Sequence, residues 1–165
     1  TMELLVIYMP LFGAERGIDA TVIGLLLGLR DAMAIGARIG FGPLIRHLGK
    51  TRLLVGSLLV SGLMLVLLPH LGAVWMMALC LAVMGFAQGF GAPLSLSWLT
   101  EIVPADTRGA AFSLRLSLNR LGQFAIPVAA GSVLGMIGVA GILYTMAGTL
   151  MAGAVAVHRL QAGRT

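Results

Sequence analysis

The chain has 165 residues, of which 59% are hydrophobic and 10% are charged, and its mean hydropathy is +1.01. Charged residues make up about a quarter of a soluble globular protein, so this composition excludes that class and indicates a lipid bilayer as the solvent. The net charge of +5 does not indicate nucleic-acid binding, because the arginines are spread along apolar segments and form no basic face.

Six apolar segments follow one another along the chain, separated by charges, prolines and turn residues. A membrane-spanning helix needs roughly 20 mostly apolar residues. We therefore expect an all-α integral membrane protein, a bundle of six transmembrane helices with short connections. The expected segments cover residues 1–12, 21–44, 53–68, 73–99, 108–134 and 139–157.

The first segment is too short to cross a bilayer. It also begins with Thr1 and Glu3 rather than with the basic residues that open a signal peptide. We expect that the beginning of this first helix lies upstream, so that the chain is part of a longer protein.

The second segment carries charges at membrane depth. Arg30 and Asp31 lie near its midpoint, and Arg38 lies two turns further on. A central charge costs about 2.5–3.5 kcal/mol in a spanning helix, so such residues are usually functional. Asp31 and Arg38 are about 20° apart in helical projection and share a stripe that faces away from lipid. They are about 10 Å apart along the axis, too far to pair directly.

The fourth segment contains glycines at helix-packing positions. Gly85 and Gly89 have the spacing that lets two helices approach closely, and Gly91 with Pro93 should bend the helix. The bend suits either gating or the fit of a long tilted helix to the bilayer. Cys80 is the single cysteine, so an intrachain disulfide is excluded and a packing role is favoured.

The fifth segment begins after Pro104 and carries a polar stripe. Arg115, Asn119 and Gln123 fall with Arg108 within an arc of about 60–80°, and Arg120 lies on an adjacent face. This stripe must meet protein or water. Alternatively, Arg38 and Arg115 extend to the headgroups while the two amides hold helices together.

Basic residues in the short loops predict the orientation. One side has only Arg16, and the C-terminus is therefore expected in the cytoplasm with the other, basic side. The six basic residues of that side are Arg46, Lys50, Arg52, Arg108, Arg159 and Arg164.

The loop after the second segment, residues 42–54 (GPLIRHLGKTRLL), resembles the signature loop of the major facilitator superfamily. Arg46 stands where the family usually has aspartate, and Thr51 where it often has a basic residue. The residues that carry the match are Gly42, Arg46, Gly49, Lys50 and Arg52.

Two further stretches resemble the same family. Residues 104–131 are similar to the entry and body of the penultimate helix of many bacterial members, and residues 28–40 to the second helix of C-terminal halves. Arg38-Ile39-Gly40 and Arg120-Leu121-Gly122 are a short echo at corresponding places of the two three-helix units. The matched stretches lie between residues 28 and 131.

The resemblance implies that residues 1–165 are the C-terminal six-helix half of a secondary transporter, built as an inverted 3+3 repeat, with the N-terminal half absent. It implies alternating access for a small solute, coupled to a gradient such as protons, in a bacterial inner membrane. Helices one and four would line the cavity, which brings Tyr8, Gln88 and Phe90 near the solute. Helices two and five would meet the other half through Arg30, Asp31, Arg38, Arg115, Asn119, Arg120 and Gln123.

The deep charges do not balance within the chain. Four deep arginines against Asp31 leave an excess of three positive charges. We expect Asp31 to neutralise one arginine of the fifth segment. At least one other, Arg120 or Arg30, then needs an anion from outside: an acidic residue of the absent half or an anionic solute.

Two other functions fit the composition. One is a six-helix subunit that binds a small molecule for a partner ATPase. The other is a membrane enzyme, which ranks last because the sequence has no paired carboxylates, metal-ligand cluster or activated nucleophile at the interface. We therefore expect neither enzymatic activity nor a cofactor or bound metal.

Overall fold

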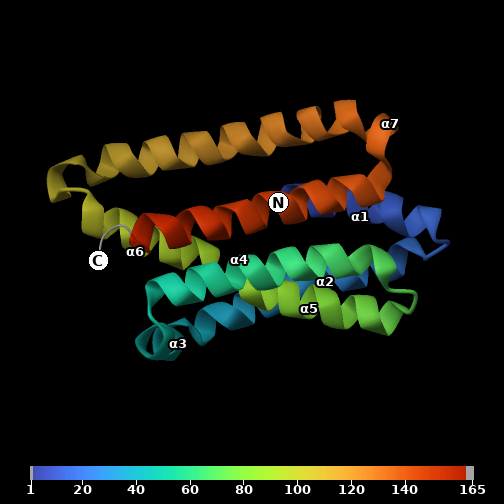
Figure 1. Cartoon of the computed structure of the whole chain (residues 1–165), viewed down its shortest axis with the longest axis horizontal. Helices are drawn as coiled ribbons and strands as arrows, with labels where there is room; N and C mark the ends of the chain where they lie inside the picture. The colour runs from blue at the N-terminus through green and yellow to red at the C-terminus, as the bar shows by residue number, and fades with distance from the viewer. Residues whose placement is uncertain (1, 163–165) are drawn as a thin grey trace.

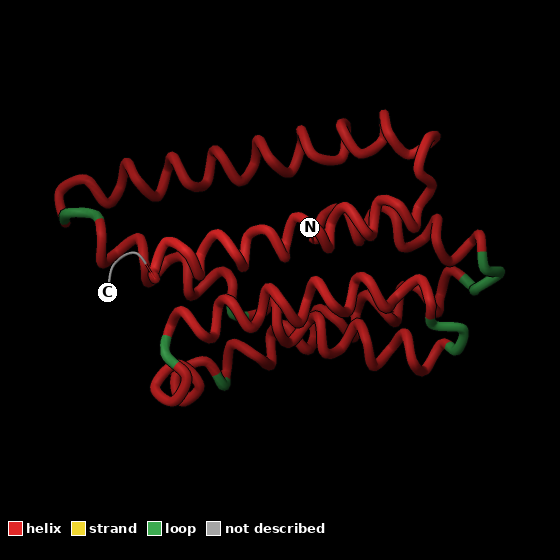
Figure 2. Tube along the Cα trace, in the orientation of Figure 1, coloured by secondary structure: helices red, strands yellow, loops and turns green. Residues whose placement is uncertain are grey.

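A computed structural model of the chain describes residues 2–162, and within this range the regular structure is entirely helical. The long helices run side by side along one axis, and the short helix α3 lies across one end (Figures 1 and 2). Side chains are described for these residues except at positions 2, 3, 41, 130, 133–137, 158 and 160–162. Thr1 and Arg164 lie outside the described residues.

Seven α-helices and two short 3₁₀ turns are found among the described residues. The longest, α7, is interrupted at Gly138, where φ is 66° and ψ is 177°. The chain reverses direction there (Figure 1), and a positive φ favours glycine. We call residues 108–137 the first arm of α7 and residues 139–162 the second arm. The bounds are α1 Met2–Glu15, α2 Ala20–Ile39, α3 Phe41–Leu48, α4 Lys50–Leu67, η1 Leu68–His70, α5 Val74–Gly89, α6 Gly91–Ile102, η2 Ala105–Thr107 and α7 Arg108–Ala162.

By length and composition, four helical stretches of the described chain can cross a membrane: residues 20–39, 50–70, 74–102 and 138–157. The apolar helix Leu4–Glu15 is shorter. The first arm of α7, which carries three arginines, is not among the four. The count of six transmembrane helices and the inverted repeat therefore stay predictions.

The structure changes one predicted boundary and confirms one predicted bend. The second segment was expected to run to Leu44, but α2 ends at Ile39 and α3 begins after a turn at Gly40. Pro43 explains this break, because proline fits the first turn of a new helix and not a helix interior. The predicted bend is present, since α5 ends and α6 begins on either side of Phe90.

A close helix contact joins α2 and α5 at Gly85 and Gly89. The spacing of the two glycines predicted a close contact but not its partner helix. A Cβ atom at Gly85 would overlap the backbone carbonyl of Arg30. A Cβ atom at Gly89 would overlap the carbonyl of Ala34 and lie 2.7 Å from the Cβ of Ala37. The two backbones therefore touch, and only glycine fits at both positions.

The main hydrophobic core lies among α1, α2, α4, α5 and the second arm of α7. Its most buried side chains include Leu5, Met9, Leu65, Leu81 and Leu143. The first arm is different, because residues 108–129 include no buried side chain. It lies along the outside of the bundle (Figure 1).

We predict that Gly85→Ala destabilises the protein by about 1–3 kcal/mol, because the new methyl group forces α2 and α5 apart. Gly28→Ala is the matched control: a Cβ atom there meets nothing within 4 Å, and alanine should be neutral or stabilising by up to about 1 kcal/mol. The midpoint of thermal unfolding in detergent measures both. Equal midpoints for the two variants would show that the close contact is absent.

Candidate functional site

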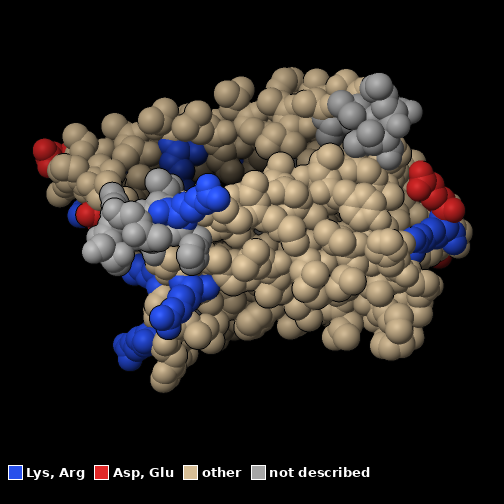
Figure 3. All heavy atoms as spheres, viewed as in Figure 1, with Lys and Arg blue, Asp and Glu red and all other residues tan. Residues whose placement is uncertain are grey.

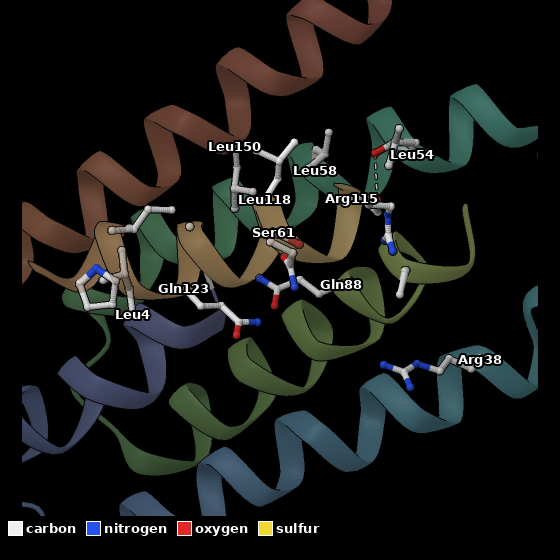
Figure 4. Close-up of a pocket in the computed structure, with 17 residues that line it drawn as sticks. Leu4, Arg38, Leu54, Leu58, Ser61, Gln88, Arg115, Leu118, Gln123 and Leu150 are labelled. Carbon is white, nitrogen blue, oxygen red and sulfur yellow. Dashed lines mark hydrogen bonds between the residues drawn. The ribbon is translucent and has the colours of Figure 1, made fainter. Parts of the chain in front are cut away.

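A cavity of about 620 Å³ lies between the first arm of α7 and the other helices. All six long helical elements contribute to its wall: α1, α2, α4, α5 with α6, and both arms of α7 (Figure 4). Five side chains that the sequence singled out meet here, namely Arg38, Gln88, Arg115, Asn119 and Gln123. The sequence reasoning missed Ser57 and Ser61 of α4, which also line it.

The first arm presents one polar face to the cavity. Arg115, Asn119 and Gln123 lie at intervals of one helical turn, and all three line the cavity. Arg115 donates a hydrogen bond of 2.6 Å to the Oγ of Ser95 on α6. Arg108, the fourth predicted member, lies at the base of the arm and donates to backbone carbonyls at the end of α6.

Two polar groups in the cavity wall lack a hydrogen-bond partner within the described residues. Ser61 is only 1% exposed, and its hydroxyl is unpaired. The Oε1 atom of Gln88 is buried and unpaired as well. A buried polar group without a partner costs about 1–3 kcal/mol, so these groups favour a polar occupant of the cavity.

The cavity has a positive and a polar side opposite an apolar side. Arg38 and Arg115 line it, and its described wall contains neither Asp nor Glu. Leu58, Leu118 and Leu150 lie together above the polar groups in Figure 4. Two positive charges without an acidic side chain in the described wall favour an occupant of opposite charge.

Two residues predicted to lie near the solute pack into the protein core. Tyr8 belongs to the main core and is 5% exposed. Phe90 packs in a small cluster with Ala37 and Leu94, and its ring meets that of Phe86 edge to face at 5.2 Å. Neither belongs to the wall of this cavity. Their predicted role concerns a cavity shared with another half, and it stays a prediction.

The pairing expected for Asp31 is wrong. Its Oδ1 lies 2.9 Å from the NH2 group of Arg30, the preceding residue, and not near an arginine of the first arm. Arg30 lies on the buried face of α2 and is 3% exposed, whereas Asp31 points outward. The long arginine side chain can bend back to its neighbour, which a comparison of helical faces overlooks.

Within the described residues, the remaining N–H groups of Arg30 have no hydrogen-bond partner, and Arg120 binds a residue of its own helix. The Nε and NH1 groups of Arg30 have no partner in the described structure. Arg120 lies on the outer face of the first arm, where it lines a second, more open hollow with Leu121 and Phe124. Its NH1 group donates to the Oε1 of Gln123 over 3.0 Å.

The loop of residues 42–54, which resembles a family signature, lies at one end of the bundle. Gly49 ends α3 with φ 77°, a conformation that favours glycine. Lys50 forms an ion pair with Glu101, which joins the start of α4 to the end of α6. Gly42, Arg46 and Arg52 are exposed at the same end, where basic atoms gather in Figure 3.

Arg16 holds the connections together at the opposite end. Its guanidinium donates to the backbone carbonyls of Pro69 and Leu71, and it stacks over the ring of Phe12 at 4.3 Å. In the same region Tyr144 and His70 are hydrogen-bonded over 3.1 Å. The part of the chain that the structure describes contains no group of three or more His, Cys, Asp or Glu side chains suited to a metal ion.

The comparisons with known proteins identify one family. The family model described as Major Facilitator Superfamily matches residues 1–162. No curated protein and no solved structure matches the chain. The match includes every residue of the cavity wall and both connected ends of the bundle.

We predict that Asp31→Asn destabilises the protein by about 1–2 kcal/mol, because it leaves the buried guanidinium of Arg30 without a counter-charge. The loss is no larger because Asp31 is exposed, and solvent weakens its interaction with Arg30. The double variant Arg30→Met, Asp31→Asn should return to the parental stability or exceed it, since methionine needs no counter-charge. Unfolding midpoints in detergent measure the three proteins. A double variant less stable than Asp31→Asn would contradict the prediction.

Proposed function

The chain belongs to the Major Facilitator Superfamily, a family of membrane transporters rather than enzymes, and on this premise we propose that it moves a small solute by alternating access, driven by an ion gradient. The observation that carries the proposal is the family match over residues 1–162, which contains a polar cavity among apolar helices. Membership of this family argues against the alternative function, a binding subunit for a partner ATPase.

Alternating access requires two bodies that rock against each other around a shared site. We propose that residues 1–165 form one of these bodies, the C-terminal half, and that a second six-helix half meets it. The outer face of the first arm supports this assignment, because it is both apolar and charged. Leu121 and Phe124 are more than half exposed there beside Arg120. A partner half with an acidic residue would cover such a face better than lipid does.

We also propose that the protein lies in a bacterial inner membrane with the end that carries Lys50 in the cytoplasm. The basic residues at this end and the single Arg16 at the other support the orientation. It places the Lys50–Glu101 ion pair on the cytoplasmic side and the Arg16 contacts with Pro69 and Leu71 on the periplasmic side.

Alternating access can be tested by cysteine labelling, since Cys80 is the single cysteine of this chain and can be replaced. In the full-length protein without other cysteines, we predict that Gln88→Cys reacts with a membrane-impermeant maleimide from either side of the membrane. An imposed pH gradient should change the two labelling rates in opposite directions.

Met77→Cys is the control for this experiment, because Met77 lies on the same helix, is fully buried in the main core and does not line the cavity. It should stay unlabelled under all conditions. Labelling of residue 88 from one side only, whatever the gradient, would refute alternating access at this cavity.

The orientation has its own test. A phosphatase fused after residue 165 should be inactive, and a green fluorescent protein at the same place should fluoresce, since the first matures only in the periplasm and the second in the cytoplasm. Fusions placed between residues 71 and 73 should give the reverse pattern. An active phosphatase after residue 165 would overturn the assignment of the cytoplasmic side.

A further inference from the structure

The cavity beneath the first arm of α7 is walled by residues of this chain. Its wall comes from helices at both ends of the sequence, from Leu4 to Leu150. Its volume of about 620 Å³ falls within the roughly 300–1,000 Å³ that small-molecule sites occupy. The cavity is therefore large enough for an organic ligand, and its lining determines which kind.

Arg115 supplies a charged donor group to this cavity. The guanidinium carries five N–H donors, and within the described residues one of them is engaged, by Ser95. Arg38 adds a second positive charge from α2, and Figure 4 shows its side chain extending toward the cavity. Without an acidic side chain in the described wall, these charges lack a counter-ion there.

Ser61 provides an independent indication of a ligand. Ser61 lines the cavity and is 1% exposed, and its hydroxyl has no hydrogen-bond partner among the described residues. A serine hydroxyl can donate one hydrogen bond and accept others. In Figure 4 Ser61 lies beside Gln88, whose Oε1 atom is also buried without a partner. Because the amide oxygen and nitrogen exchange places on a flip of the side chain, Gln88 can present a donor to the same ligand.

The opposite wall is apolar. Leu58 of α4, Leu118 of the first arm and Leu150 of the second arm form one side of the space, above the polar groups in Figure 4. Each apolar group that covers this wall removes hydrophobic surface from water. A small inorganic anion would leave these leucines uncovered, whereas a ligand with a hydrocarbon portion would contact them.

We propose that this cavity binds an amphiphilic organic anion, with its anionic head between Arg115 and Ser61 and its hydrocarbon body against Leu58, Leu118 and Leu150. The inference rests on the proposed transport function and specifies the class of solute. The ligand is a carboxylate or phosphate ester with an apolar tail. It can reach the site from water as a free organic acid or from the bilayer as an anionic lipid.

The test measures equilibrium binding of radiolabelled octanoate to the full-length purified protein. Unlabelled octylammonium and octanol have the same tail and serve as competitors. Octanoate should bind saturably, octylammonium should fail to compete, and octanol should compete only weakly. Absence of octanoate binding, or equal competition by octylammonium, would show that the cavity selects no anion.

Two substitutions tie the binding to this cavity. Arg115→Gln should weaken octanoate binding about tenfold or more, because a charge-assisted hydrogen bond is lost. Gln88→Glu, on α5, leaves the first arm intact and should weaken binding to a similar extent through the added negative charge. It keeps the proposal testable if Arg115→Gln fails to fold. Unchanged affinity in a folded form of either variant would overturn the proposal.

Arg159→Gln is the control, since Arg159 carries the same charge on the second arm of α7 and is exposed outside the wall of this cavity. It should leave octanoate affinity unchanged, and a loss equal to that of Arg115→Gln would refute the assignment to this cavity. Elution as a single species on size exclusion confirms that each variant is folded.

Nanodiscs distinguish the two sources of the anion. If phosphatidylglycerol in a phosphatidylcholine disc displaces octanoate, the occupant comes from the bilayer. If it does not, the occupant comes from water. Both results support the anion site.

Octanoate binding with these dependences but without gradient-dependent labelling at residue 88 would support the anion site and refute transport. The reverse pattern would refute the anion site alone.

Discussion

Gly85 and Gly89 set the separation of α2 and α5, and the cavity depends on that separation. With no side chain at either position, the backbone of α5 rests on the carbonyls of Arg30 and Ala34. The contact directs Gln88, between the two glycines in sequence, toward α4 and the first arm of α7. A larger residue at either glycine would therefore alter the polar wall as well as the packing.

The first arm of α7 is attached differently from the rest of the bundle. The other long helices bury leucines and methionines against each other, whereas residues 108–129 bury none. Polar contacts hold this arm: Arg108 binds the end of α6, and Arg115 binds Ser95. Segments with little buried apolar surface are the ones that move at low energetic cost.

Much of this arrangement could be predicted from the sequence, because hydropathy and helical periodicity depend on local residue order. The stripe of Arg115, Asn119 and Gln123 follows from spacing, and the bend at Phe90 follows from Gly91 and Pro93. Ser61 could not be found in this way, since one serine in an apolar run is common in membrane helices. The lack of a hydrogen-bond partner for its hydroxyl among the described residues is seen only in the folded structure, where α4 and the first arm lie together.

The partners of charged side chains were equally hard to predict, because a helical projection shows which residues share a face and not how far a side chain can bend. The projection placed Asp31 with Arg38 and away from Arg30, whereas the structure pairs Asp31 with Arg30. Since these two are neighbours in one helix, their ion pair needs no other segment of the chain. An isolated α2 therefore already carries a counter-charge for Arg30, and Gly85 covers the Arg30 backbone when α5 packs against it.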